Sequence, residues 1–190
     1  MTGVGGARLG VFLHVLVLLW AAILAPGAQG ADTDSTLERR VKAAFLFQFL
    51  PYIERPLPPR GPSDAPFVIA VVGGEDIVAE FGAVIGGRTV AEKPVVVRRW
   101  RESDLNGGPH IVYVRRSESA RLPIIARAAQ ATATLVVTES DGALGQGSMI
   151  NFQIVDGRVR FDVALDAIEA AGLRISSRLL AVARNVRSVP

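Results

Sequence analysis

Arginine is the residue type whose placement in this chain best suits a binding site. Arg160 is expected on the polar face of a β-hairpin, and Arg174 and Arg178 stand on either side of Ser176. A guanidinium is always charged and holds a carboxylate or phosphate through two hydrogen bonds. Free N–H groups at a helix start near Ser176 also favour an anion. We therefore predict a site for a small anion, formed by Arg160, Arg174, Arg178 and Asn151.

Acidic residues close to these arginines allow a second interpretation. Asp162, Asp166 and Glu169 lie nearby in the sequence, and each carboxylate is a suitable partner for a guanidinium. In that case the arginines are structural or simply solvated, and no anion binds.

Side chains that catalyse reactions or bind metals are sparse. His110 is the one histidine beyond the first 30 residues, and we expect it to cap or pack a strand end. Gly73-Gly74 lacks the other residues of a nucleotide-binding loop, and no Gly-x-Ser-x-Gly motif is present. Asp162 and Asp166 are expected to face Asn151 and to cap a helix instead of forming a catalytic pair. The sequence therefore predicts a protein that is not an enzyme and uses no metal or cofactor.

The elements that carry the arginines begin with a hairpin. Asp156-Gly157 suits a type I′ turn, in which both central residues need positive φ. Counting outward from this turn fixes the register of the two strands. One face is apolar, with three predicted pairs: Ile154–Val159, Phe152–Phe161 and Ile150–Val163. The other face is polar, with two predicted pairs: Gln153–Arg160 and Asn151–Asp162.

Two helices are predicted after the hairpin. Asp166 and Glu169 have the spacing of a capping box, and Gly172 is expected to end that short helix. Ser176 then caps a final helix that is expected to extend to Val186.

A long helix is predicted near the N-terminus. Residues 35–38 form a second capping-box pattern, so the helix is expected to run from Thr36 to about Leu50. Its C-terminal part is apolar on nearly every side, which means either burial all round or contact with another protein. On the second interpretation, the partner-binding candidates are the aromatic residues there: Phe45, Phe47, Phe49 and Tyr52.

The middle of the chain predicts a sheet between helices. Helical spacing at 77–85 and 123–130 supplies crossovers. Four short apolar runs suit strands that are covered on both faces: 67–72, 94–97, 111–114 and 135–137. The expected fold class is α/β, a single-domain α/β sandwich with a mixed sheet flanked by helices and a C-terminal β-hairpin plus helices.

Residues 1–30 have the pattern of a cleavable signal peptide. Arg8 precedes an apolar run at 9–24, and small residues at 28–30 suit cleavage before Ala31. We expect residues 31–190 to form one exported domain. The net charge of +3 and the scattered arginines do not indicate nucleic-acid binding.

Several segments resemble a known family. Residues 148–152, 156–161 and 171–180 are similar to the C-terminal signature of YfiR-like periplasmic proteins, and 42–49 with 52–56 are similar to that family's first helix. The resemblance implies an inhibitor of an inner-membrane diguanylate cyclase that contacts the cyclase's periplasmic region. It also implies sequestration by an outer-membrane, peptidoglycan-binding lipoprotein, and association into homodimers.

The chain departs from the family pattern at a few positions. Gln48, Arg55 and Ala164 stand where Asn, Trp and Asn are common, and the chain has no cysteine, which excludes redox switching through disulfides. The alternative function is a small periplasmic module that binds an anionic solute, either a nucleotide or an amino acid. Against this alternative, one compact domain has no cleft between two lobes.

Overall fold

The computed structural model describes residues 29–55 and 65–188. The predicted signal peptide, 1–30, lies outside this part of the chain except for its last two residues. Residues 56–62 contain four prolines, which predict a stiff surface connection, and they lie outside it entirely. The chain divides into two units, 1–35 and 36–190, and the fold described below is that of the second. Among the helices of the described part, none has both the length and the apolar character needed to cross a membrane.

Within the described residues, eight strands form one mixed sheet in the order β10-β8-β7-β6-β5-β2-β4-β3. Strands β2, β4, β5, β6 and β7 run parallel to one another, while β3, β8 and β10 run the opposite way. The bounds are β2 Phe67–Val72, β3 Thr89–Val90, β4 Lys93–Arg99, β5 Ile111–Val114, β6 Leu135–Thr138, β7 Ile150–Val155, β8 Arg158–Ala164 and β10 Asn185–Arg187. The four predicted apolar runs are β2, β4, β5 and β6, so the prediction of a mixed α/β fold is confirmed.

The parallel strands have the order of a doubly wound sheet. Across the sheet, β4-β2-β5-β6-β7 corresponds to 2-1-3-4-5 in chain order, so the direction of winding reverses between β2 and β5. Open α/β sheets bind ligands outside the carboxyl ends of their strands at such a reversal. The residues that follow β2, β5 and β6 are therefore of special interest.

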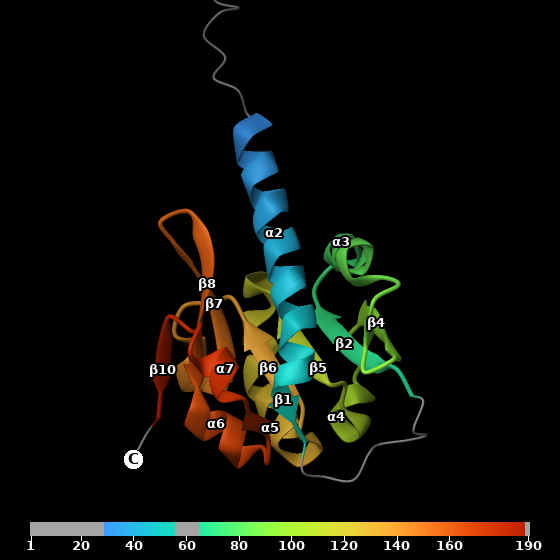
Figure 1. Cartoon of the computed structure of the whole chain (residues 1–190), viewed down its shortest axis with the longest axis vertical. Coiled ribbons are helices and arrows are strands. Elements are labelled where there is room, and N and C mark those ends of the chain that lie inside the picture. Colours follow the sequence, from blue (N-terminus) through green and yellow to red (C-terminus); the bar gives the residue numbers. More distant parts are fainter. Residues whose placement is uncertain (1–28, 56–64, 189–190) are drawn as a thin grey trace, which may run out of the picture. The chain divides into compact units, whose positions relative to one another are not determined.

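Helices cover both faces of the sheet (Figure 1). α2 (Gln29–Phe49) and α3 (Glu75–Ile85) share one face, where the rings of Phe81 and Tyr113 lie 5.2 Å apart. Val112 points to the opposite face, because side chains alternate along a strand, and lines a small space with α5 (Leu122–Thr132). The shorter elements are η1 Leu50–Tyr52, β1 Ile53–Glu54, α4 Asp104–Gly107, η2 Arg116–Arg121, η3 Ala143–Gln146, α6 Leu165–Ala170, β9 Arg174–Ile175 and α7 Ser177–Leu180. Of these, β1 and β9 pair antiparallel as a separate small sheet.

Aromatic side chains from α2 and the hairpin form the centre of the core. Phe45 and Phe49 of α2 contact Phe152 and Phe161 of the hairpin, with ring centroids 5.2 to 6.0 Å apart. Contacts of this kind add about 0.5–1.5 kcal/mol each beyond the burial of area. They fix α2 against the apolar face of the hairpin.

The predicted hairpin is confirmed in every pair. β7 and β8 have the expected register, from Ile150 opposite Val163 to Ile154 opposite Val159. At the turn, Asp156 has φ of 49° and Gly157 has φ of 68°, as a type I′ turn requires.

Three predicted helix boundaries are wrong. α2 starts at Gln29 instead of Thr36. α6 starts at Leu165, one residue before the predicted cap, and a carboxyl oxygen of Asp166 is buried without a hydrogen-bond partner. Ser176 does cap α7, but this helix ends at Leu180. The chain beyond it pairs with the free edge of β8 as β10, which satisfies backbone groups that a continued helix would leave unpaired.

Candidate functional site

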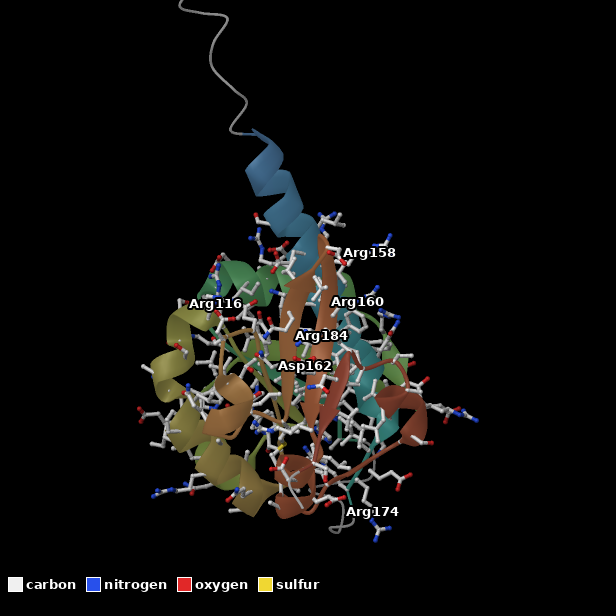
Figure 2. The ribbon with its side chains drawn as sticks, turned by 90° about the vertical axis from the view of Figure 1, so that its left-hand side faces the viewer. Arg116, Arg158, Arg160, Asp162, Arg174 and Arg184 are labelled. Carbon is white, nitrogen blue, oxygen red and sulfur yellow. The ribbon has the colours of Figure 1, made fainter. Side chains whose placement is uncertain are left out.

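The structure does not bring the predicted arginine site together. Figure 2 shows Arg160 on the hairpin and Arg174 at the far end of the molecule, so one small anion does not contact both. Arg174 lies on β9, which pairs with β1, and Arg178 lies on the exposed side of α7. Asn151 is only 2 % exposed, and its Oδ1 accepts a hydrogen bond of 2.6 Å from Thr138. A structural role accounts for Asn151.

Asp162 has a different arginine partner from those predicted. Arg184 forms two hydrogen bonds to its carboxylate, and the backbone N–H of Arg184 donates to Phe161 at 2.9 Å. The hydrogen bonds to Asp162 raise the pKa of Arg184. The pair therefore fixes β10 against β8 (Figure 2).

The aromatic residues proposed for partner binding lie in or against the core. Phe49 is fully buried, while Phe45, Phe47 and Tyr52 are half-buried and pack on the core. The guanidinium of Arg88 lies 3.8 Å above the ring of Phe47 and covers it. In this conformation the four residues present little free surface.

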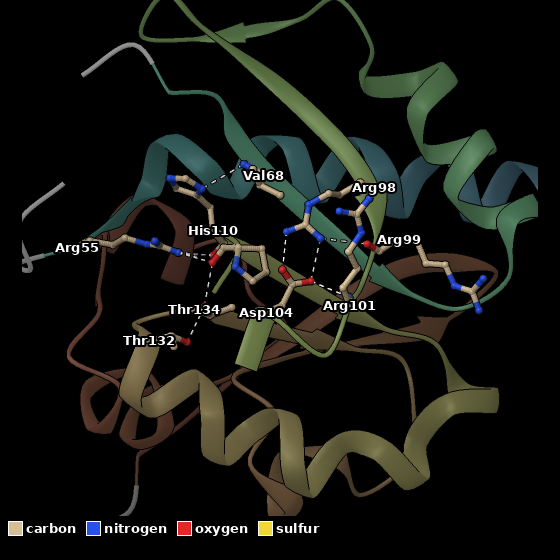
Figure 3. Close-up of polar contacts among 10 residues, drawn as sticks. Arg55, Val68, Arg98, Arg99, Arg101, Asp104, His110, Thr132 and Thr134 are labelled. Carbon is tan, nitrogen blue, oxygen red and sulfur yellow. Dashed lines mark hydrogen bonds and ion pairs between the residues drawn. The ribbon is translucent and has the colours of Figure 1, made fainter. Parts of the chain in front are cut away.

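His110 has the structural role that we expected. Its Nδ1 accepts a hydrogen bond of 3.1 Å from the backbone of Val68, and its ring packs edge-on against Phe67 (Figure 3). Arg55 donates to the carbonyl oxygens of Pro109 and His110, both at 2.9 Å. These contacts join the start of β5 to its neighbours. Among the described residues, no group of three or more His, Cys, Asp and Glu side chains is placed to hold a metal ion.

An open cleft of about 540 Å³ lies at the carboxyl ends of β5 and β6, next to the point where the winding of the sheet reverses. It combines charged side chains with an apolar wall from the hairpin, which is the composition of many small-molecule sites. The lining residues are Glu38, Lys42, Arg115, Arg116, Ser117, Glu139, Phe152 and Ile154.

A buried lysine forms the charged floor of this cleft. The side chain of Lys42 is 5 % exposed and pairs with Glu38 on its own helix and with Glu139 at 2.5 Å. Glu139 also accepts hydrogen bonds from the hydroxyl of Tyr113 and from the backbone N–H of Arg116. Burial alone would raise the pKa of Glu139, but Lys42 and these hydrogen bonds outweigh it, so the pKa lies below its usual value. Burial and the nearby Glu139 raise the pKa of Tyr113 well above its usual value.

Two arginines at the mouth of the cleft have weak partners. Arg116 is 62 % exposed and lies 3.2 Å from Asp141, and Arg115 lies 3.6 Å from Asp76. Exposed pairs of this kind contribute about 0–1 kcal/mol. Both guanidinium groups can therefore exchange these carboxylates for an anionic ligand whose apolar part would lie against Ile154.

This cleft was not among the sites predicted from the sequence. Its charged floor joins Lys42 and Glu139, which are 97 positions apart. One feature of the sequence does point to the cleft: polar residues directly follow the buried strands β5 and β6, at the edge of the sheet where such folds bind ligands.

The structure is therefore a mixed α/β domain with an open, charged cleft, which lies next to the point where the winding of the sheet reverses. The chain belongs to the YfiR/HmsC-like family (DUF4154), whose model matches residues 39–184. This family is consistent with a regulatory and not a catalytic role, in the periplasm. The resemblance seen in the sequence is therefore confirmed.

Other comparisons add information on the fold only. A conserved domain protein from Vibrio cholerae has a similar structure, with a TM-score of 0.54 and 11 % sequence identity. The match covers 78 % of this chain and 60 % of the other, so the chain spans less than two thirds of that protein's length. No curated protein matches the sequence.

Proposed function

We propose that this protein is a periplasmic regulator that represses an inner-membrane diguanylate cyclase by direct contact and so lowers cyclic di-GMP. The observation that supports this proposal is the family match over 39–184, which runs from α2 to the residue before β10. The domain also has a hydrophobic core and many exposed charged side chains, which suits a protein that acts through its surface.

Repression requires that the protein bind the inactive state of the cyclase more tightly than the active state. Binding then shifts the cyclase population toward inactivity, by as much as the two affinities differ. A second partner that binds the repressor releases the cyclase by mass action, and we propose an outer-membrane, peptidoglycan-binding lipoprotein for this role. We also propose that the protein is a homodimer when it is bound to neither partner.

The contact with the cyclase must be made by exposed side chains. A charge placed at the buried Phe49 would unfold the core before it tested recognition. On α2, Leu37, Arg40 and Gln48 are exposed, and Leu37 is the most exposed large apolar residue of this helix among the described side chains.

Co-purification from membranes tests the proposed function. We expect the tagged protein to capture the cyclase from detergent extracts, and its deletion to raise cyclic di-GMP and biofilm formation. The Leu37→Asp variant tests whether α2 takes part in the contact with the cyclase. Gln48→Asp, which adds the same charge at another exposed position of α2, is its control. If deletion leaves cyclic di-GMP unchanged and the protein captures no cyclase, the proposed function is wrong.

A second candidate function is the binding of an anionic solute, and the charged cleft supports it. The site would use Arg115 and Arg116 instead of the scattered Arg160, Arg174 and Arg178. Calorimetry with a panel of nucleotides and amino acids tests this function. We expect binding that the Arg115→Gln/Arg116→Gln variant loses while its melting temperature is kept. Absence of heat for the whole panel would contradict solute binding.

A further inference from the structure

Two unpaired arginines lie side by side on the outer face of the hairpin. Arg158 and Arg160 are two positions apart on β8, so both point to the face opposite the aromatic core. Gln153 stands opposite Arg160 and Val155 opposite Arg158, and both are only partly exposed. Figure 2 shows Arg158, Arg160 and Asp162 one after another along the hairpin. We call Arg158 and Arg160 the basic pair.

The protein itself does not neutralise the basic pair. Among the described residues, neither guanidinium has a hydrogen bond or an ion pair. The next acid along the strand, Asp162, is held by Arg184, and Asp156 at the turn pairs with neither arginine. Two like charges about 7 Å apart on one strand repel each other, and no acidic side chain of the described residues pairs with them to offset that repulsion.

The hairpin holds the basic pair in a fixed position. The strand beneath it is anchored on its other face by Phe161, which contacts Phe45 and Phe49 of α2. On the outer edge, the Asp162–Arg184 pair joins β8 to β10. A ligand that binds the arginines therefore has no backbone to order in this protein, which favours affinity.

We propose that the basic pair docks an acidic, extended segment of a partner protein, and that this partner is the periplasmic region of the cyclase. The inference rests on the proposed function. Side chains on one face of an extended chain repeat every ~7 Å, so carboxylates at alternate positions of such a segment match Arg158 and Arg160. Each guanidinium then binds one carboxylate through two hydrogen bonds.

An anionic lipid surface suits this face less well than a polypeptide. Membrane binding by a protein surface depends on apolar side chains that enter the acyl boundary as well as on cations. On this face, the residues opposite the basic pair are Gln153 and Val155, and both side chains are only partly exposed.

Binding measurements on the processed protein test the proposal. The probes are the purified periplasmic region of the cyclase, a synthetic peptide with glutamate at alternate positions, and vesicles that contain phosphatidylglycerol. The variant is Arg158→Gln/Arg160→Gln. The matched control is Arg101→Gln/Arg127→Gln, which removes two exposed arginines, one from the connection between β4 and α4 and one from α5. Circular dichroism is used to check that both variants stay folded.

We expect the Arg158→Gln/Arg160→Gln variant to bind the cyclase region and the peptide at least tenfold more weakly than the wild type. The salt dependence of binding should fall as well, because two ionic contacts are lost. The control variant should bind as the wild type does. Equal binding by all three proteins would overturn the role of the basic pair and leave the proposed function in place.

Two further outcomes separate the inference from the proposed function. If the wild type binds the peptide through the basic pair but not the cyclase region, the cyclase is the wrong partner, and the proposed function fails with it. If only the vesicles bind, and this binding needs Arg158 and Arg160, the surface is a lipid site and our assignment of a protein segment is wrong.

Discussion

At the scale of single residues, Lys42 is a charged group inside the core of the domain. Its ammonium group is almost fully buried and is surrounded by Glu38, Glu139 and, through Glu139, Tyr113. A buried charge is tolerated only when its partners compensate for lost hydration. These contacts tie α2 to the carboxyl ends of β5 and β6, so we expect them to matter for stability as well as for the cleft.

Replacement of Lys42 should show how much this network contributes. We expect Lys42→Met to lower the free energy of unfolding by about 3–5 kcal/mol, because Glu139 would stay buried without its cation. The double variant Lys42→Met/Glu139→Gln should recover part of that loss, since no uncompensated charge is left. Arg116→Gln, which breaks an exposed pair with Asp141, should cost less than about 1 kcal/mol. Denaturant unfolding of the variants measures these differences, and a small effect of Lys42→Met would contradict the assignment.

The lowered pKa of Glu139 predicts the direction of a pH effect. Its folded pKa lies below the ordinary value of 4.5, so the unfolded state binds the proton more readily. The stability from Glu139 is therefore present above that value and is lost as the pH falls through the folded pKa. We expect the stability difference between the wild type and Glu139→Gln to be largest near neutral pH and to shrink below pH 4.5. Unfolding curves at several pH values measure it, and a difference that grows on acidification would contradict the sign.

At the scale of elements, the hairpin is the part that the sequence predicts best, because its signals are local. Asp156-Gly157 specifies the turn, and alternation of apolar and polar residues fixes the register. The β-branched runs likewise predict β2, β5 and β6, which are largely buried. The run at 94–97 is a strand too, but the prediction that it is covered on both faces is wrong, because Val96 of β4 is exposed.

The hairpin register makes a direct prediction about stability. Phe152 is 2 % exposed and contacts both Phe45 and Phe49, so Phe152→Ala should cost about 3–5 kcal/mol. Gln153, the next residue, points to the other face and is partly exposed, so Gln153→Ala should cost under about 1 kcal/mol. Chemical denaturation of the two variants gives the comparison. Similar losses at both positions would show that the two faces are assigned wrongly.

Elements set by distant contacts could not be predicted from local patterns. β10 has three exposed residues without alternation, and it is a strand because the edge of β8 offers backbone partners. Arg174 was predicted to lie beside Arg160, but β9 pairs with β1 and holds it elsewhere. The cleft depends on α2 meeting the ends of β5 and β6, which no segment of the sequence encodes alone.

At the scale of the whole molecule, the same core supports two separate surfaces. The charged cleft opens where β5 and β6 end, while Arg158 and Arg160 lie on the outer face of β8. A ligand in the cleft would contact Phe152 and Ile154 on the inner face of the hairpin. The hairpin therefore contributes its inner face to the cleft and its outer face to the basic pair.

Export of the whole chain gives the last prediction. The pattern of residues 1–30 predicts a signal peptide that is removed before Ala31, and the proposed repression takes place in the periplasm. A chain that lacks residues 2–30 should therefore stay in the cytoplasm and lose repression, although the purified domain keeps the melting temperature of the processed protein. Adding an unrelated cleavable signal peptide to this shortened chain is the control, and it should restore both location and repression. Cell fractionation, mass spectrometry of the N-terminus and cyclic di-GMP levels provide the measurements. Repression by the unexported chain would contradict a periplasmic site of action.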